Sequence, residues 1–455
     1  MTNEANDSVQ VARLNARIDR LPVWGLSHRV FFAVGIAYLF AFYDLIAVSF
    51  VLPHLTRVFH LTGYQIALPV TANLIGYSIG ALLLGVVADY VGRRRAMFYT
   101  VVLLACGGLL TALSWNDVSL AIFRLITGLG MGADISMAAA IMGEFSPARA
   151  RGRNIQYNYL WGAGGLAVTP FVAIALLHVG PLGWRLVFGL GVGVAFVGLG
   201  MRGRWLPESP RWLVLHHRYD EAEQLVCDME RTAQARVQRP LPPVPEVPPE
   251  TALRSFPVVE LFRPPYLRRL LVIVGFWVVW YITVYAFLGY EPTLLIKMGL
   301  SVQNGLAKSA VGYLATPVAA IGVLFIIDKI QRKYLVSMIA FVFAIACALL
   351  ALSIDVPMIL LGSAVASMMI AANAAAYVYT AEAFPTRARA TGTAIGIGVS
   401  HVGGASSAFI VVAALNAWGA RGTFWLLGAI VALSGVIMLV GGVKTTGEGL
   451  TEIAE

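Results

Sequence analysis

Apolar positions along this chain gather into twelve long runs, most of them separated by short polar turns. The runs cover residues 29–53, 65–87, 96–114, 119–142, 154–177, 185–203, 269–290, 309–327, 334–352, 356–380, 391–415 and 422–443. A helix rises about 1.5 Å per residue, so each run can cross a hydrocarbon core about 30 Å thick. Only 13% of the residues are charged, whereas soluble domains have about 25%. The pattern predicts an all-α membrane protein with twelve transmembrane helices.

The longest polar interruption divides the apolar runs into two sets of six. We expect a cytoplasmic N-terminal tail (1–28), a six-helix bundle (29–203), a cytoplasmic linker (204–268), a second six-helix bundle (269–443) and a C-terminal tail (444–455). Within the linker, the segment from Tyr219 onward predicts a short amphipathic helix packed beneath the membrane domain. The proline-rich residues 239–250 that follow it cannot be helical. The basic N-terminal tail has no apolar region typical of a signal peptide.

Basic residues are concentrated on one side of this topology. With the N-terminus inside, the outer side holds five Lys and Arg residues, namely Arg57, Arg185, Lys297, Lys308 and Arg421. Arg124 lies within a helix, and the other 27 of the 33 lie inside. The positive-inside rule therefore places both termini in the cytoplasm. We expect a multi-pass protein of the inner (plasma) membrane. The net charge of +9 follows from these loop residues and does not indicate nucleic-acid binding.

The remaining composition favours neither an enzyme nor a cofactor. The three cysteines, Cys106, Cys227 and Cys347, are scattered, which is not the pattern of a disulfide framework or a metal site. The GxG sequences lie in predicted membrane helices, so they are not nucleotide-binding loops. We predict a monomer embedded in the lipid bilayer.

Two short motifs recur at almost the same distance along the chain. Residues 144–151, EFSPARAR, recur as residues 382–389, EAFPTRAR, an offset of 238. Asp89 with Arg93 and Arg94 recurs as Asp328 with Arg332 and Lys333, an offset of 239. Two separate matches at one offset indicate parallel structural repeats. Where membrane proteins built from such repeats bind a substrate, the site lies between the repeats, near the middle of the bilayer.

These residues resemble a known family. The segment GVVADYVGRRR (85–95) resembles the loop between the second and third helices of the major facilitator superfamily. Arg124 with Gly128, PESPRWL (207–213) and TTGEGLTEI (445–453) resemble its sugar-porter and organic-ion transporter (metabolite:proton symporter) branches. The resemblance covers nearly the whole chain. It implies the superfamily fold, with two pseudo-symmetric bundles, and secondary transport by alternating access.

The loop motifs predict a conformational latch at the inner face. An acid in such a loop can meet a helix end and neighbouring arginines, and so hold the inner face closed. The latch candidates are Asp89, Gly92, Arg93, Arg94, Glu144 and Arg151 in the first half, and Asp328, Arg332, Glu382 and Arg389 in the second. Plain positive-inside anchoring explains the arginines but not Asp89 before Gly92. The second copy has Gln331 where glycine is usual, which predicts a weaker latch there.

Three charged residues lie inside predicted spans, where they are costly unless they face protein or water. Asp44 is about 13 Å and Arg124 about 8 Å below the outer ends of their helices at 1.5 Å per residue. A long arginine can bridge that difference if the helices are adjacent. In proton-coupled sugar porters the matching pair couples transport to protons, which the resemblance implies here. A static structural salt bridge is the alternative.

Asp134 faces about 80° away from Arg124 on the same helix, so we expect no direct pair between them. Three roles stay open for it: binding a cationic substrate, carrying a second proton, or bonding to the backbone and Ser136.

The predicted substrate cavity is rich in rings and poor in amides. Sugar porters place glutamines and asparagines in helix seven, and this helix has none. Such a cavity suits a flat or aromatic solute better than a hexose. The uncharged binding candidates are Tyr43, Tyr159, Trp161, Tyr281, Tyr285, Asn373, Tyr377 and His401. Aromatic packing is the alternative for each ring, and a neutral hydrogen-bonded histidine is the alternative for His401. Glu291 is interpreted as an interface residue.

The sequence thus predicts proton-coupled uptake of a small organic solute, an aromatic or other monocarboxylic acid. Arg124 and His401 are the available positive groups for a carboxylate. An organic cation or sugar symporter, a drug/proton antiporter and a transporter-like sensor stay open as alternatives.

Overall fold

The computed structural model describes residues 2–202, 205–245, 258–264, 266–327, 329–384 and 389–445, and all regular structure within these ranges is helical. Eleven helical stretches there are long and apolar enough to cross a membrane. The last stretch, Thr391–Gly441, contains Gly419 with φ 66° and ψ −175°. Glycine adopts this non-helical conformation without strain, so the chain turns and the stretch supplies two spans. The all-α membrane fold predicted from the apolar runs is confirmed.

The first half of the bundle contains six spans, five of them single helices. These are α2 (His28–Val58), α3 (Leu68–Val91), α4 (Arg93–Ala112), α5 (Asp117–Phe145) and α6 (Arg151–Leu177). The sixth is made of α7 (Gly183–Leu190), η3 (Gly191–Val194) and α8 (Ala195–Arg202). The short helices η1 (Gly63–Ile66) and η2 (Ala148–Ala150) lie in the turns.

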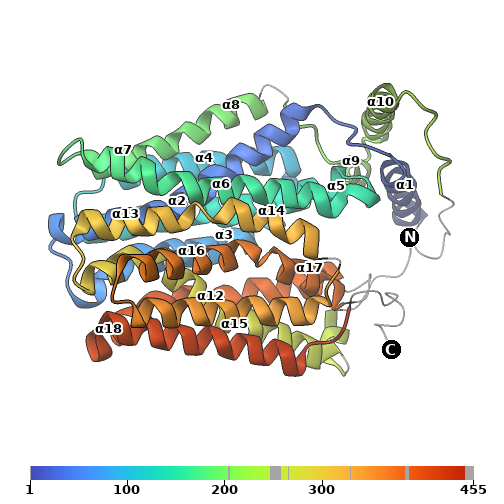
Figure 1. Cartoon of the computed structure of the whole chain (residues 1–455). Coiled ribbons are helices and arrows are strands. Elements are labelled where there is room, and N and C mark those ends of the chain that lie inside the picture. The colour runs from blue at the N-terminus through green and yellow to red at the C-terminus, as the bar shows by residue number, and fades with distance from the viewer. Residues whose placement is uncertain are drawn as a thin grey trace.

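The second half repeats this arrangement with more interrupted spans. It contains η4 (Val258–Phe262), α12 (Tyr266–Lys297), α13 (Val302–Tyr313), α14 (Thr316–Ile326), α15 (Arg332–Leu352), α16 (Val356–Ala372), α17 (Ala374–Glu382) and α18 (Arg389–Gly441). In Figure 1 the blue and green helices of the first half lie along one side of the bundle, and the yellow to red helices of the second half lie along the other. A substrate site between the repeats would therefore lie along the middle of this bundle.

Gly128 and Gly132 bring α3 and α5 into close contact. A Cβ at Gly128 would overlap the backbone carbonyl of Asn73, and one at Gly132 would overlap that of Tyr77. Small residues allow this approach because no side chain separates the two backbones. The contact fixes Asn73 and Tyr77 against the helix that carries Arg124 and Asp134.

A group of three helices lies at one end of the bundle: α1 (Thr2–Asp19), α9 (Pro210–Leu215) and α10 (Tyr219–Val237) (Figure 1). The predicted amphipathic helix is α10, and it begins at Tyr219 as expected. The helix α1 was not predicted, because the N-terminal segment was interpreted as a polar tail. The buried hydrophobic residues of α10 lie on one face at helical spacing: Ala222, Val226, Met229 and Ala233.

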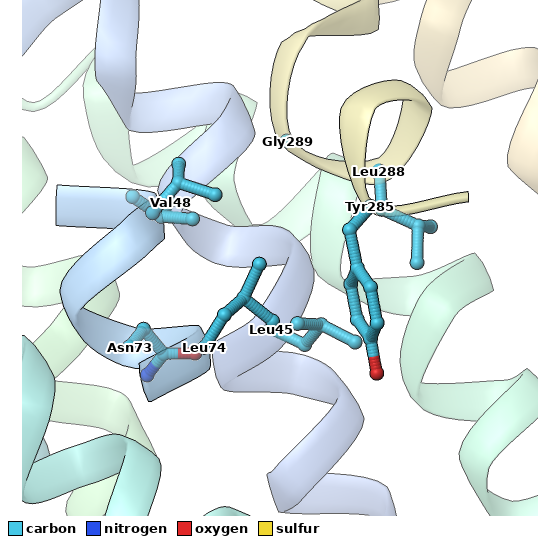
Figure 2. A pocket seen from close by; sticks show the side chains of 8 residues that line it. Leu45, Val48, Asn73, Leu74, Tyr285, Leu288 and Gly289 are labelled. Atoms are coloured by element: carbon cyan, nitrogen blue, oxygen red, sulfur yellow. The ribbon is translucent and has the colours of Figure 1, made fainter. Parts of the chain in front are cut away.

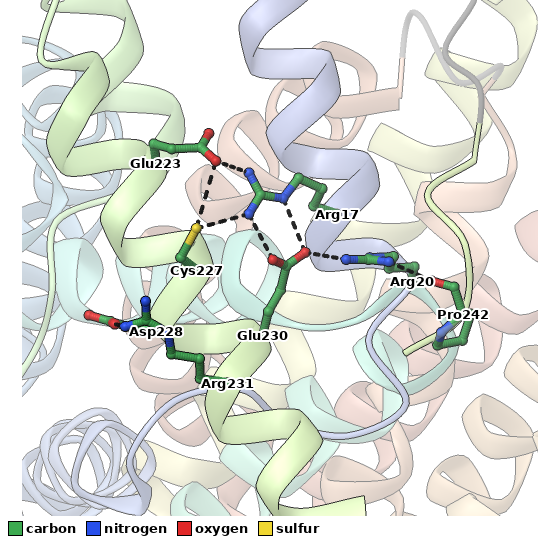
Figure 3. Close-up of polar contacts among 8 residues, drawn as sticks. All are labelled: Arg17, Arg20, Glu223, Cys227, Asp228, Glu230, Arg231 and Pro242. Atoms are coloured by element: carbon green, nitrogen blue, oxygen red, sulfur yellow. Dashed lines mark hydrogen bonds and ion pairs between the residues drawn. The ribbon is translucent and has the colours of Figure 1, made fainter. Parts of the chain in front are cut away.

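Ion pairs join α1 to α10, as Figure 3 shows. Arg17 contacts Glu223, and its Nη2 lies 2.7 Å from Oε2 of Glu230. Arg20 lies 2.6 Å from the other oxygen of Glu230. Burial would raise the pKa of Glu230, but hydrogen bonds from the two arginines outweigh it and lower the pKa. The first part of the linker is thus attached to the N-terminal segment.

The two halves touch at several levels. Toward the predicted outer end, the Tyr290 hydroxyl donates to the Ile66 carbonyl at 3.3 Å. Toward the other end, the Gln156 amide donates to the Ala320 carbonyl at 3.2 Å. Between these levels the Tyr159 hydroxyl donates to the Ile370 carbonyl at 3.4 Å.

Candidate functional site

Asp44 and Arg124 form a buried ion pair between α2 and α5. Nη1 of Arg124 lies 2.8 Å from both carboxylate oxygens of Asp44. Arg124 is fully buried and Asp44 is 4% exposed. The guanidinium also lies over the Phe188 ring, 5.4 Å from its centroid. Charge-assisted hydrogen bonds of this kind are strong, and a cation retained in the membrane needs such a partner.

Aromatic rings from both halves meet in the middle of the bundle. We call this set the ring cluster: Tyr38, Phe42, Tyr77 and Tyr159 from the first half, with Trp277, Tyr281, Tyr285, Tyr377 and His401 from the second. Within it, the hydroxyls of Tyr281 and Tyr377 are 3.0 Å apart. The ring cluster therefore offers flat apolar surfaces edged with hydroxyl groups.

His401 is the point at which the ring cluster joins the two halves. Its ring stacks on Tyr77 of α3, with centroids 4.4 Å apart and planes at 24°. It also lies 4.6 Å from the Tyr281 ring. Nδ1 donates to the Ile397 carbonyl at 2.9 Å, whereas Nε2 is buried and has no hydrogen-bond partner in the described part of the chain. The free nitrogen is available to a ligand that separates the rings.

Asp134 is fully buried on α5, and neither carboxylate oxygen has a hydrogen-bond partner among the described residues. The Ser136 hydroxyl donates instead to the Gly132 carbonyl at 2.9 Å. The role in which Asp134 bonds to the backbone and Ser136 is therefore not realised. Tyr38 of the ring cluster lies within electrostatic range of Asp134. A buried polar group without a partner is costly, which makes Asp134 a candidate for a ligand or a proton.

A small cavity lies beside Tyr285 of the ring cluster, as Figure 2 shows. Its volume of ≈ 10 Å³ leaves room for about one water molecule. Its lining includes Leu45, which follows Asp44, and Tyr285 of the ring cluster. It also includes Asn73, whose amide donates to the Arg124 carbonyl at 3.2 Å. The cavity therefore borders the ring cluster and lies one residue along α2 from Asp44.

The latch candidates of the first half form a connected set. Arg93 lies 2.9 Å from Asp89 and 3.3 Å from Glu144. Gly92 has φ 96°, where a side chain would be strained, and a Cβ there would overlap the Glu208 carboxylate. The Arg94 backbone N–H donates to Glu208 at 3.2 Å.

Arg151 extends this set to the N-terminal helix. It donates to the Gly143 carbonyl at 3.1 Å and lies 2.5 Å from Asp19 of α1. In the second half, Arg332 lies 3.1 Å from Glu382. Asp328 and the side chain of Arg389 lie outside the described residues.

Comparison with known proteins identifies the family. Residues 33–455 match the family described as "Sugar (and other) transporter". The chain belongs to this transporter family.

Individual relatives agree with this assignment over most of the chain. A Bacillus subtilis protein named "Putative metabolite transport protein YyaJ" is 30% identical over 85% of this chain and 85% of its own. The niacin transporter NiaP of Acinetobacter baylyi is 26% identical over 97% of this chain and 99% of its own. The Escherichia coli xylose transporter XylE, in a partially occluded inward-open conformation, superposes with a TM-score of 0.74 at 18% identity, covering 92% and 99%.

These matches establish the fold and the functional class of this member of the sugar (and other) transporter family. Its two-bundle fold is that of the major facilitator superfamily, as the sequence resemblance implied. It is a multi-pass membrane transporter and not an enzyme.

Three predicted binding residues of this transporter lie outside the ring cluster. The Tyr43 hydroxyl donates to the Val187 carbonyl at 2.7 Å, within the first half. Trp161 packs against Gly35 and the ring of Phe32, which is 54% exposed. Asn373 is the buried residue between α16 and α17.

Sequence reasoning missed the position of Glu291. It was interpreted as an interface residue, yet it is fully buried. Hydroxyl groups of Ser309 and Ser363 donate to its two carboxylate oxygens. The same helix carries Tyr285 of the ring cluster, seven residues before Pro292. The signal that could have revealed Glu291 is an acid inside a 32-residue apolar helix, which is rare without a function.

Proposed function

We propose that this transporter carries a small aromatic monocarboxylate together with protons, by alternating access between its two halves. The observation that supports this most is the stack of His401 on Tyr77, which spans the boundary between the halves inside the ring cluster. A flat ring that replaced this contact would touch both halves at once. Its carboxylate would meet the free Nε2 of His401 when that nitrogen is protonated.

The composition of the ring cluster supports an aromatic solute over a sugar. Sugar hydroxyls need side-chain amides or acids as hydrogen-bond partners, and α12 contains no Asn or Gln. Aromatic pairs contribute about 0.5–1.5 kcal/mol each beyond simple area burial. The name of one relative, the niacin transporter, refers to an aromatic carboxylic acid and so supports the same class.

Proton coupling is assigned to Asp44 and Arg124. A carboxylate paired with one cation in a dry membrane interior loses that partner when it is protonated, because a neutral acid attracts a guanidinium far less. Release of Arg124 would loosen α2 from α5 and permit the halves to rock. The cavity lined by Leu45 and Tyr285 supports a connection between this event and the ring cluster.

An organic cation is the second candidate, because Asp134 is buried, has no hydrogen-bond partner among the described residues and lies within electrostatic range of Tyr38. A cation seated there would gain both a carboxylate and several ring faces. The amide-poor lining of the ring cluster disfavours a sugar.

We further propose that the protein is a monomer of the plasma membrane with both termini in the cytoplasm. We also propose that the five-part division at residues 28, 203, 268 and 443 describes its domains.

Thermal unfolding of the purified protein tests these solute classes directly. A ligand that binds only the folded state raises the melting temperature by mass action. Nicotinate and 4-hydroxybenzoate represent the acids, tetraethylammonium the cations and xylose the sugars, each at about pH 5.5 and 7.5. Stabilisation by the acids, greater at the lower pH, is the expected result. Stabilisation by tetraethylammonium alone, lost in Asp134→Asn, would replace the acid with a cation.

Counterflow in sealed proteoliposomes separates a carrier from a sensor. Vesicles preloaded with unlabelled nicotinate should take up labelled nicotinate faster than empty vesicles. Equal uptake in the two preparations, with thermal stabilisation retained, would indicate a binding protein that does not transport.

A further inference from the structure

Glu291 is a buried acid of the second half. It is fully buried on α12, and Ser309 of α13 and Ser363 of α16 donate to its carboxylate oxygens. The titratable groups that face it are Tyr313 on α13 and Cys347 on α15. No lysine, arginine or histidine forms an ion pair with it in the described ranges.

The fourth-span partner of Glu291 occupies the position that Arg124 has in the first half. The offset of 239 residues that relates Arg93 to Arg332 also relates Arg124 to Ser363. In each half, therefore, a carboxylate on the first span bonds to this position on the fourth span. The first half has an arginine there and the second half has a serine.

This exchange changes what the carboxylate needs. An ionised carboxylate buried without a cation is strongly disfavoured, whereas a neutral carboxylic acid is tolerated when it is hydrogen-bonded. Two hydroxyl groups can serve either form, because a hydroxyl both donates and accepts. The serines therefore stabilise the ionised form when water is admitted and the neutral form when the site is dry.

Glu291 lies next to a contact between the halves at the predicted outer end. Tyr290, the residue before Glu291, donates to Ile66 in the opposite half. Tyr313 packs against Phe50 of α2, with ring centroids 6.1 Å apart. When these contacts separate, water gains a route to Glu291 from the outer side.

We propose that Glu291 is a second proton-binding site, distinct from the Asp44–Arg124 pair. It takes a proton from the outer side as the halves close over it, and it releases the proton when water returns. The step forms one O–H bond on the carboxylate and breaks one in hydronium. This inference rests on the proposed function for its place in the transport cycle, but proton binding at Glu291 does not depend on the identity of the solute.

Infrared difference spectroscopy of the full-length protein in liposomes, titrated from about pH 5 to 9, tests the site. A protonated carboxyl has a carbonyl stretching band that disappears on ionisation. We expect Glu291→Gln to remove one such pH-dependent band, and Glu291→Asp to retain it at a shifted frequency. The Asp variant keeps the assignment possible if Gln prevents folding. Asp117→Asn, at the outer start of α5, is the matched control and should leave the band in place.

Two results would contradict proton binding at Glu291. Wild type and Glu291→Gln could give the same pH-dependent bands, or the Glu291 band could stay constant over the whole titration, as for a permanently neutral structural acid. In the Asp44→Asn background the Glu291 band should persist. If Asp44→Asn still accumulates solute while the Glu291 band titrates, the proposed coupling residue is wrong and the second site stands.

Discussion

The two halves of this transporter agree at their predicted inner ends and differ in the middle of the membrane. Arg93 with Glu144 and Arg332 with Glu382 are repeat-related ion pairs of similar length, 3.3 and 3.1 Å. In the middle, the first half has Asp44 bound to Arg124, and the second half has Glu291 bound to serines. The two repeats share the ion pairs that connect neighbouring spans, whereas their buried charged residues differ. A carboxylate with a cation and one without respond differently to a proton.

Asp44→Asn should have the largest effect on transport. The amide resembles a permanently protonated acid, so it cannot exchange a proton with the solution. We expect nicotinate accumulation driven by a pH gradient to fall to equilibrium, while counterflow of nicotinate continues. Accumulation at the wild-type level would remove Asp44 from the coupling mechanism, and Asp117→Asn controls for the loss of an acid elsewhere.

Removing the fourth-span partner of the carboxylate should lower the free energy of unfolding by a different amount in each half. Arg124→Ala leaves a buried carboxylate unpaired, which costs about 3–5 kcal/mol. Ser363→Ala removes one hydroxyl donor from Glu291, which costs about 1–3 kcal/mol. Denaturant unfolding in detergent compares the two variants. Equal losses would show that Glu291 is held as an anion as firmly as Asp44.

His401→Phe should retain the stack on Tyr77 and lose the free Nε2. If that nitrogen binds the solute carboxylate, the KM for nicotinate should rise about tenfold, which corresponds to about 1.4 kcal/mol. Tyr281→Phe removes a ring hydroxyl nearby and serves as the control, with a smaller expected rise. An unchanged KM in His401→Phe would leave His401 as a packing residue.

The inner ion pairs should contribute less. Both are partly exposed, so each contributes about 1 kcal/mol or less. Arg93→Gln and Arg332→Gln should shift the balance between inward- and outward-open forms by similar small amounts. Alkylation of a cysteine introduced at Gln156, which bonds across the halves at that end, measures the shift. A large effect of one variant alone would show that the latches are not equivalent.

The smallest effect is expected where α1 joins α10. The pKa of Glu230 is lowered in the folded state, so its ion pairs stabilise the contact above the ordinary pKa. That contribution is lost as the pH falls below about 4.5, through the lowered value. At neutral pH Glu230→Gln should reproduce the loss. Cys227, which contacts Arg17, should then react faster with maleimide, whereas Asp228→Asn should not change the rate.

The sequence was sufficient for the spans because the apolar runs are long and membrane thickness restricts their interpretation. It was also sufficient for the contact of Asp44 with Arg124, because depth along two helices can be counted. It was not sufficient for Trp161 or Glu291, since the neighbour that a side chain meets depends on how helices rotate and cross. It missed α1 because the stabilising partners of Arg17 lie more than 200 residues away.

The attachment of α10 to α1 has a consequence for how the protein could be built. Because α9 and α10 are held by the N-terminal helix, everything up to Gln238 belongs to one body. A chain interrupted between residues 245 and 258 would lose none of the ion pairs or hydrogen bonds described above. Two separately synthesised polypeptides should therefore find each other in the bilayer and assemble into one carrier.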